Sequence, residues 1–261
     1  MSRLIDKFHE ASKVTAPPMG FRTAKPAAAA LKILLIASVE AGTLEKRADY
    51  LGAADAVLVR FTGTVLTAKA IQKAAASLPD IPWGLYLGDD DTKKGAAAEA
   101  GADFFLFAAD SQVAETGKDD KTGKILQVES SMDDGLLRAV NDLPVEAVLA
   151  ADTSEGEGPL VWHQLMILQH LANLLSKPLI VAAHGDISEK ELKALWDAGV
   201  DGITVEADKV GAAGLKELRQ TIDKLPPRSG RKHGKVNVVL PRTGGETPAP
   251  PPPDEEEEED E

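Results

Sequence analysis

One histidine, one arginine and a set of carboxylates each come directly after an apolar run of the sequence: His184, Arg60, Asp89, Glu129, Asp152 and Glu206. Histidine can take up and return a proton near neutral pH, so we expect His184, assisted by Glu129 and Asp152, to be the acid–base candidate. Carboxylate oxygens are the ligands of hard divalent cations. The four carboxylates therefore also form a candidate magnesium site.

Each of these carboxylates also has a structural interpretation, because acidic loop residues often cap the helix that follows.

Two other chemistries are disfavoured. A Schiff-base enzyme needs a lysine near the end of a strand, but the strand-associated Lys32, Lys124 and Lys177 stand at strand beginnings. A zinc hydrolase needs clustered histidines, and only His184 follows an apolar run in this way.

The elements that position these residues can be predicted from a repeated Gly-x-Asp motif. The motif leads from a helix end into an apolar run at Gly52, Gly101 and Gly199, which are 49 and 98 residues apart; the first copy has one extra residue. The missing member is expected near residue 150, where Pro144, Val145 and Glu146 precede another apolar run. Four such units, each with two β-α modules, predict an α/β protein of the (βα)8 TIM-barrel class.

The expected strands are apolar runs that fit burial on both faces of a parallel sheet. They cover residues 32–38, 55–61, 83–87, 103–108, 124–128, 145–150, 178–183 and 202–206. In this fold the ligand site lies at the C-terminal ends of the strands, which is where His184 and the carboxylates fall. We therefore expect Arg60, Gly185, Asp186, Glu206 and Lys209 to contact a ligand.

The segment 177–206 resembles the strand 7–strand 8 region of phosphate-binding TIM barrels. It contains Lys177 to Ser188, with the sequence KPLIVAAHGDIS, followed by Trp196, Ala198 and Gly199. Indole-glycerol-phosphate synthase, thiamine-phosphate synthase and the FMN-dependent nitronate monooxygenases are similar in this region. The resemblance implies that the backbone around Gly185 and Asp186 faces a phosphate. The chain departs from these families after residue 205, where Glu206 and Asp208 replace a glycine-rich turn.

The organisation along the chain predicts four parts. Residues 1–31 contain a helix at 3–13 and a lead-in, residues 32–225 form the barrel, and residues 226–246 form an extension with one strand at 235–240. Residues 247–261 consist of prolines followed by eight acids, a composition that cannot bury apolar surface, so we expect disorder.

The composition limits the partners. Eight of the thirteen excess negative charges belong to residues 254–261, and no basic face is evident, so nucleic-acid binding is disfavoured. No apolar run approaches the length of a membrane span, and the N-terminus lacks the apolar core of a signal peptide. The absence of cysteine suits a reducing compartment. These features favour a cytoplasmic protein.

The expected helix at residues 160–175 has apolar residues on more than one face, whereas an outer barrel helix needs one apolar stripe. The excess face predicts either a homo-oligomer contact or cover by the N-terminal helix and the C-terminal strand.

Two functional hypotheses follow. The first is an enzyme that binds a small phosphorylated or carboxylated metabolite and performs lyase or isomerase chemistry by proton transfer, with FMN or magnesium as the cofactors to consider. The second is a non-catalytic barrel that serves as a binding or interaction module.

Overall fold

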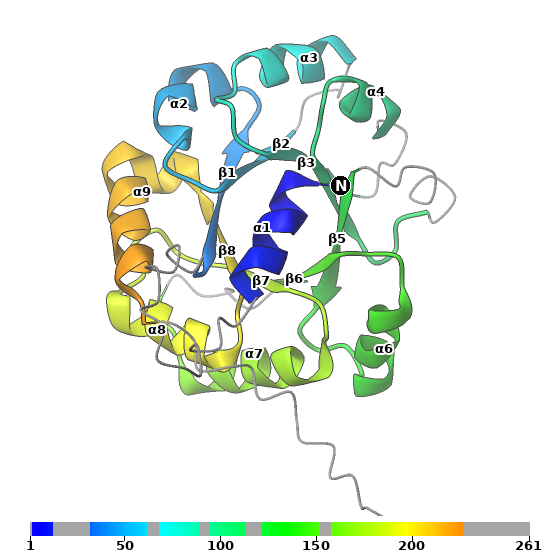
Figure 1. Cartoon of the computed structure of the whole chain (residues 1–261), viewed down its shortest axis with the longest axis vertical. Coiled ribbons are helices and arrows are strands. Elements are labelled where there is room, and N and C mark those ends of the chain that lie inside the picture. Colours follow the sequence, from blue (N-terminus) through cyan, green and yellow to red (C-terminus); the bar gives the residue numbers. More distant parts are fainter. Residues whose placement is uncertain are drawn as a thin grey trace, which may run out of the picture. The chain divides into compact units, whose positions relative to one another are not determined.

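Eight parallel strands close into a barrel in the order of the sequence, as the repeated motif predicts (Figure 1). The computed structural model describes residues 2–12, 32–61, 68–88, 94–112, 122–151 and 158–226. The strands are β1 (Leu34–Glu40), β2 (Ala56–Arg60), β3 (Trp83–Gly88), β4 (Phe104–Ala108), β5 (Gly123–Glu129), β6 (Ala147–Ala151), β7 (Leu179–Ala182) and β8 (Gly202–Glu206). The predicted TIM-barrel class is confirmed.

Helices surround the barrel, and α1 lies across one of its ends (Figure 1). They are α1 (Arg3–Ser12), α2 (Leu44–Leu51), α3 (Ala68–Ala76), α4 (Lys94–Glu99), α6 (Asp134–Ala139), the 3-10 helix η2 (Val140–Asp142), α7 (Trp162–Leu174), α8 (Glu189–Ala198) and α9 (Ala207–Lys224). None of these helices combines the length and apolar character needed to cross a membrane. The expected strand at 235–240 and the acidic tail lie outside the described residues.

The last helix begins earlier than the sequence suggests. Helix α9 starts at Ala207, directly after β8, whereas its apolar pattern predicts a start near residue 213. Gly211 interrupts it with a φ of 68° and a ψ of −178°, a left-handed conformation that side chains with a Cβ disfavour. The apolar pattern therefore identifies only the part of α9 beyond this kink.

The acidic residue of the repeated motif ties neighbouring strands together at their beginnings. The backbone N–H of Leu35 in β1 donates to Asp55 Oδ2 at 2.9 Å, and that of Leu179 in β7 donates to Asp201 Oδ2 at 2.9 Å. Glu146 plays the same part for Lys124 in β5, at 2.6 Å. The unit that lacks the motif's glycine therefore still has its acid, which accepts from a backbone N–H at the beginning of the neighbouring strand.

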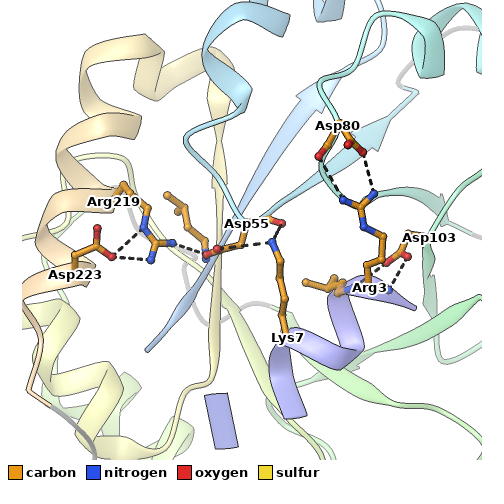
Figure 2. A network of polar contacts seen from close by, with 9 residues as sticks. Arg3, Lys7, Asp55, Asp80, Asp103, Arg219 and Asp223 are labelled. Atoms are coloured by element: carbon orange, nitrogen blue, oxygen red, sulfur yellow. Dashed lines mark hydrogen bonds and ion pairs between the residues drawn. The ribbon is translucent and has the colours of Figure 1, made fainter. Parts of the chain in front are cut away.

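Asp103, the acid of the second motif, instead caps α1. Its carboxylate accepts hydrogen bonds from Ser2 Oγ at 2.7 Å, Arg3 N at 2.7 Å and Leu4 N at 2.9 Å. Figure 2 shows this cap beside two further links from α1, in which Arg3 contacts Asp80 and Lys7 contacts Asp55. The capped helix is thereby fixed at the end of the barrel where the strands begin.

Helix α1 closes that end with an apolar face. Leu4, Ile5 and Phe8 are buried in the same cluster as the inward side chains of the strands. A Cβ on Gly202 would lie 3.0 Å from the Phe8 ring, so the glycine in β8 leaves room for the ring to pack. Helix α1 is therefore part of the barrel core, and a ligand can approach the interior only from the opposite end.

Inward-facing side chains stack in layers of four, taken from alternate strands. The register places Ile36, Gly84, Ile125 and Ile180 in one layer, and Leu58, Leu106, Leu149 and Thr204 in the layer above it. The next layers towards the C-terminal ends are Ser38, Tyr86, Gln127 and Ala182, then Arg60, Ala108, Ala151 and Glu206. The interior thus changes from apolar to polar at Thr204.

Candidate functional site

The upper layers of the barrel enclose a cavity of about 450 Å³, which we call the mouth cavity. Leu58, Leu106 and Leu149 contribute to its lining from below, and small side chains at Ala151 and Ala182 leave the space above them open. Its polar lining comes from Ser38, Arg60, Tyr86, Gln127, His184, Thr204, Glu206 and Lys209. Because ligands of TIM barrels bind at this end, the mouth cavity is the candidate functional site.

Three buried polar atoms at this cavity make no hydrogen bond within the described structure: Ser38 Oγ, Thr204 Oγ1 and Arg60 Nε. Ser38 is only 4% exposed. Buried polar groups in folded proteins are nearly always paired, since an unpaired one costs about 1–3 kcal/mol. Two hydroxyls and a guanidinium N–H that converge on one cavity are therefore groups that a polar ligand can satisfy.

A cluster of charges forms one side of the mouth cavity. Arg60 Nη2 lies 3.3 Å from Glu206 Oε1, Arg60 Nε lies 3.9 Å from Glu40 Oε1, and Lys209 Nζ lies 3.0 Å from Glu206 Oε2. Partial burial tends to raise the pKa of Glu206, but the hydrogen bond from Lys209 and the charge of Arg60 outweigh it, so this pKa is lowered. Glu206 is therefore ionised at neutral pH and pairs with both cations.

A second cavity, of about 710 Å³, adjoins the first and is called the side cavity. It lies between the end of β7 and helices α7 and α8, and it shares His184, Gly185 and Lys209 with the mouth cavity. Asp186 lines the side cavity but not the mouth cavity. Half-buried His184 thus stands on the wall between the two cavities, where its imidazole can serve a ligand in either.

The loop after β7 is held by close packing and by the start of α8. A Cβ on Gly185 would come within 2.4 Å of Val210 Cγ2, so only glycine fits between β7 and α9. Ser188 and Glu191 form a reciprocal capping box at the start of α8, and Glu191 Oε1 also accepts from the N–H of Leu160 at 2.7 Å. Hydrogen bonds from Ser188 and Leu160 lower the pKa of Glu191. These contacts fix the floor of the side cavity.

The predicted ligand residues Arg60, Gly185, Asp186, Glu206 and Lys209 therefore line these two adjoining cavities. The structure does not test the predicted metal set, because only Glu129 and Glu206 of its four members are described. The described residues contain no group of three or more His, Asp or Glu placed to hold a metal ion. Asp89 and Asp152 lie outside the described residues, and Glu129 is exposed, with Ser131 Oγ 3.5 Å from its carboxylate. Their roles stay predictions.

Asp208 makes contacts on the outer side of the rim. Its carboxylate pairs with Arg47 of α2 and accepts from Oγ1 of Thr43, the residue before that helix, at 3.0 Å. Of the two carboxylates after β8, therefore, only Glu206 lines the mouth cavity among the described residues.

Sequence reasoning missed Thr204, Gln127 and Tyr86 as site residues. A sequence signal was available for two of them. Thr204 lies two residues before Glu206 and Gln127 two residues before Glu129, so each polar side chain is on the same face of its strand as the residue at the strand's end. Because side chains alternate along a strand, both members of such a pair point into the barrel.

Comparison with solved structures supports the fold. A mutant of the tryptophan synthase alpha-subunit from Pyrococcus furiosus is 14% identical, with a TM-score of 0.55, and the match covers 74% of this chain and 97% of that one. A protein from Aquifex aeolicus VF5 is 14% identical, with a TM-score of 0.60, over 84% of this chain and 99% of that one. A FabK mutant from Thermotoga maritima is 17% identical, with a TM-score of 0.54, over 80% of this chain and 66% of that one.

No known protein family matches the chain by sequence, and no curated protein does. At 13–17% identity the structural matches establish a shared fold, the (βα)8 TIM barrel that the sequence predicts.

Proposed function

We propose that the barrel binds a small metabolite that carries an anionic group, phosphate or carboxylate, together with hydroxyl or carbonyl oxygens. The observation that carries this proposal is that Ser38 Oγ, Thr204 Oγ1 and Arg60 Nε, which make no hydrogen bond within the described structure, all lie at the mouth cavity. The anionic group would bind at Arg60 and Lys209, and the neutral oxygens would reach the hydroxyls of Ser38 and Thr204 deeper in the barrel.

His184 would supply proton transfer in an isomerase or lyase reaction. Its imidazole would remove a proton from a carbon next to a carbonyl, and the electron pair would move onto the carbonyl oxygen as an enolate. Arg60 would stabilise that negative charge, and the imidazolium would return the proton to the neighbouring atom. Gly185 and Asp186, on the side cavity, would contact whatever part of the ligand extends beyond the barrel axis. The lack of cysteine supports a cytoplasmic site of action.

The test starts from purified full-length protein. A panel of small phosphorylated and carboxylated metabolites, with inorganic phosphate, is screened for an increase in melting temperature, since a ligand that binds only the native state stabilises it. An absorption spectrum taken first shows whether a flavin is bound.

Thr204→Val removes the buried hydroxyl and keeps the side-chain shape. Because that hydroxyl is unpaired, we expect the unliganded variant to be more stable than the wild type by up to about 1 kcal/mol and to lose most of the ligand-induced shift. Thr221→Val on α9, whose hydroxyl donates to Glu217 O at 2.9 Å, is the matched control and should keep that shift. A panel without any stabilising ligand, or an unchanged response in Thr204→Val, would contradict the proposal.

His184→Gln separates catalysis from binding. If the barrel is an enzyme, this variant binds the identified ligand and fails to convert it. If the wild type binds the ligand without converting it, the barrel is a binding module.

A further inference from the structure

Helix α7 presents an apolar outer face that no other part of the described structure covers. Trp162 is 81% exposed, Met166 is 66% exposed and Val161, just before the helix, is 51% exposed. The inner face of the same helix packs Leu168, Leu171 and Ala172 against the barrel. Large aromatic and methionine side chains on a surface helix are typical of protein interfaces, and such exposure is unfavourable in water.

The N-terminal helix does not cover this face. Helix α1, one of the two covers that the sequence allowed, packs instead into the end of the barrel through Leu4 and Phe8. Trp162 and Met166 therefore stay exposed with α1 in place, and the C-terminal strand, the other cover that the sequence allowed, lies outside the described residues.

The outer face of α7 also lacks charge. None of the thirteen residues of α7 is Asp, Glu, Lys or Arg, whereas the ten residues of the adjacent α8 include Glu189, Lys190, Glu191, Lys193 and Asp197. Uncharged side chains at the centre of a contact are a compositional mark of interfaces. In a chain with a net charge of −13, this helix is the face on which another acidic molecule meets the least repulsion.

We infer that the α7 face binds a second copy of this chain. A partner for this surface must itself offer an uncharged apolar face, and the chain carries one. Five of the six exposed residues of α7 follow one stripe at helical spacing, with His163 beside it: Trp162, Met166, Gln169, His170 and Asn173. If two α7 helices pack antiparallel about a two-fold axis at Met166, the two Met166 side chains meet.

In the same arrangement each Trp162, four residues before the axis, faces His170 of the second copy, four residues after it. His170 is positioned by a 2.8 Å contact between its Nε2 and Asp134 Oδ1 of α6, so its ring is held in place for stacking. The stripe is therefore complementary to itself, as a two-fold contact requires. Gln169 and Asn173 supply polar groups at the rim.

The decisive measurement is the mass of the full chain in solution by analytical ultracentrifugation over a concentration series. We expect a dimer of twice the 27.6 kDa monomer, and we expect Trp162→Glu and Met166→Glu each to shift it to monomer. Leu143→Glu is the matched control, because Leu143 is also an exposed apolar residue, at 46%, but lies after η2 and off this face. A wild type that stays monomeric throughout overturns the inference, as does a dimer that both α7 variants leave intact.

The absence of cysteine allows a second test that does not depend on weakening a contact. In Met166→Cys the single introduced thiol lies at the proposed two-fold axis, so mild oxidation should link two copies by a disulfide. Leu143→Cys gives the rate of linkage by random collision. Equal rates in the two variants would refute the two-fold contact at Met166.

Discussion

Glu206 forms ion pairs with both cations that an anionic ligand needs. Its Oε1 lies 3.3 Å from Arg60 Nη2 and its Oε2 lies 3.0 Å from Lys209 Nζ. A bound phosphate or carboxylate must therefore compete with an internal carboxylate. We expect Glu206→Gln to bind inorganic phosphate about two- to fivefold more tightly than the wild type, a gain in keeping with exposed ion pairs of up to about 1 kcal/mol. Isothermal titration measures this gain, and Glu217→Gln, an exposed carboxylate on α9, should leave the affinity unchanged.

The same competition gives a pH dependence with a definite sign. The pKa of Glu206 is lowered in the folded chain, so its pairing with Lys209 and Arg60 stabilises the fold at pH values above the usual carboxyl range. That contribution is lost as the pH falls through the lowered value, and there the two cations become available. The affinity of the wild type for phosphate should rise as the pH falls through this lowered pKa. The measured affinities are corrected for the change in the protonation of phosphate itself over the same pH range. A Glu206→Gln variant that shows the same rise would assign it to another group.

The sequence identifies Arg60 and Glu206 as site residues because both stand at strand ends, which converge in any parallel barrel. Thr204 could not be chosen on that basis. Its parity with Glu206 indicates an inward side chain, but the mostly apolar run from Gly202 to Val205 does not show which side chains lie level with it. Only the closed register places Thr204 in the layer of Leu58, Leu106 and Leu149, one layer below Ser38.

At the level of elements, the repeated motif identifies the turns but not how each glycine acts. Gly101 and Gly199 have φ values of 86° and 108°, the left-handed conformation of a helix end, whereas Gly52 has a φ of −60°. The extra residue of the first copy therefore corresponds to a different turn. Likewise, the pattern at residues 3–13 predicts a helix, but its packing into the barrel depends on contacts with residues far away in the chain, such as Asp103 and Gly202.

Helix α1 should contribute strongly to stability because Phe8 is 1% exposed inside the barrel end. We expect Phe8→Ala to lower the free energy of unfolding by about 3–5 kcal/mol, as removal of a large buried side chain leaves a cavity. Urea denaturation followed by circular dichroism measures the loss. Glu10→Ala, on the exposed face of the same helix, should change the stability by no more than about 0.5 kcal/mol. A loss below about 1 kcal/mol for Phe8→Ala would mean that α1 is not part of the barrel core.

At the scale of the whole molecule, the net charge of −13, eight of which belong to residues 254–261, means that two copies repel each other at long range. Salt shortens the reach of this repulsion, to about 10 Å at 0.1 M. Because α7 has no charged side chain at the proposed contact, salt weakens no ion pair within that helix. We therefore expect the dissociation constant of the dimer to fall several-fold as sodium chloride is raised to physiological strength. Sedimentation equilibrium measures this change, with Trp162→Glu remaining monomeric at both salt concentrations. A dissociation constant that rises with salt would mean that ion pairs join the copies, and the interface would then lie on a charged surface and not on α7.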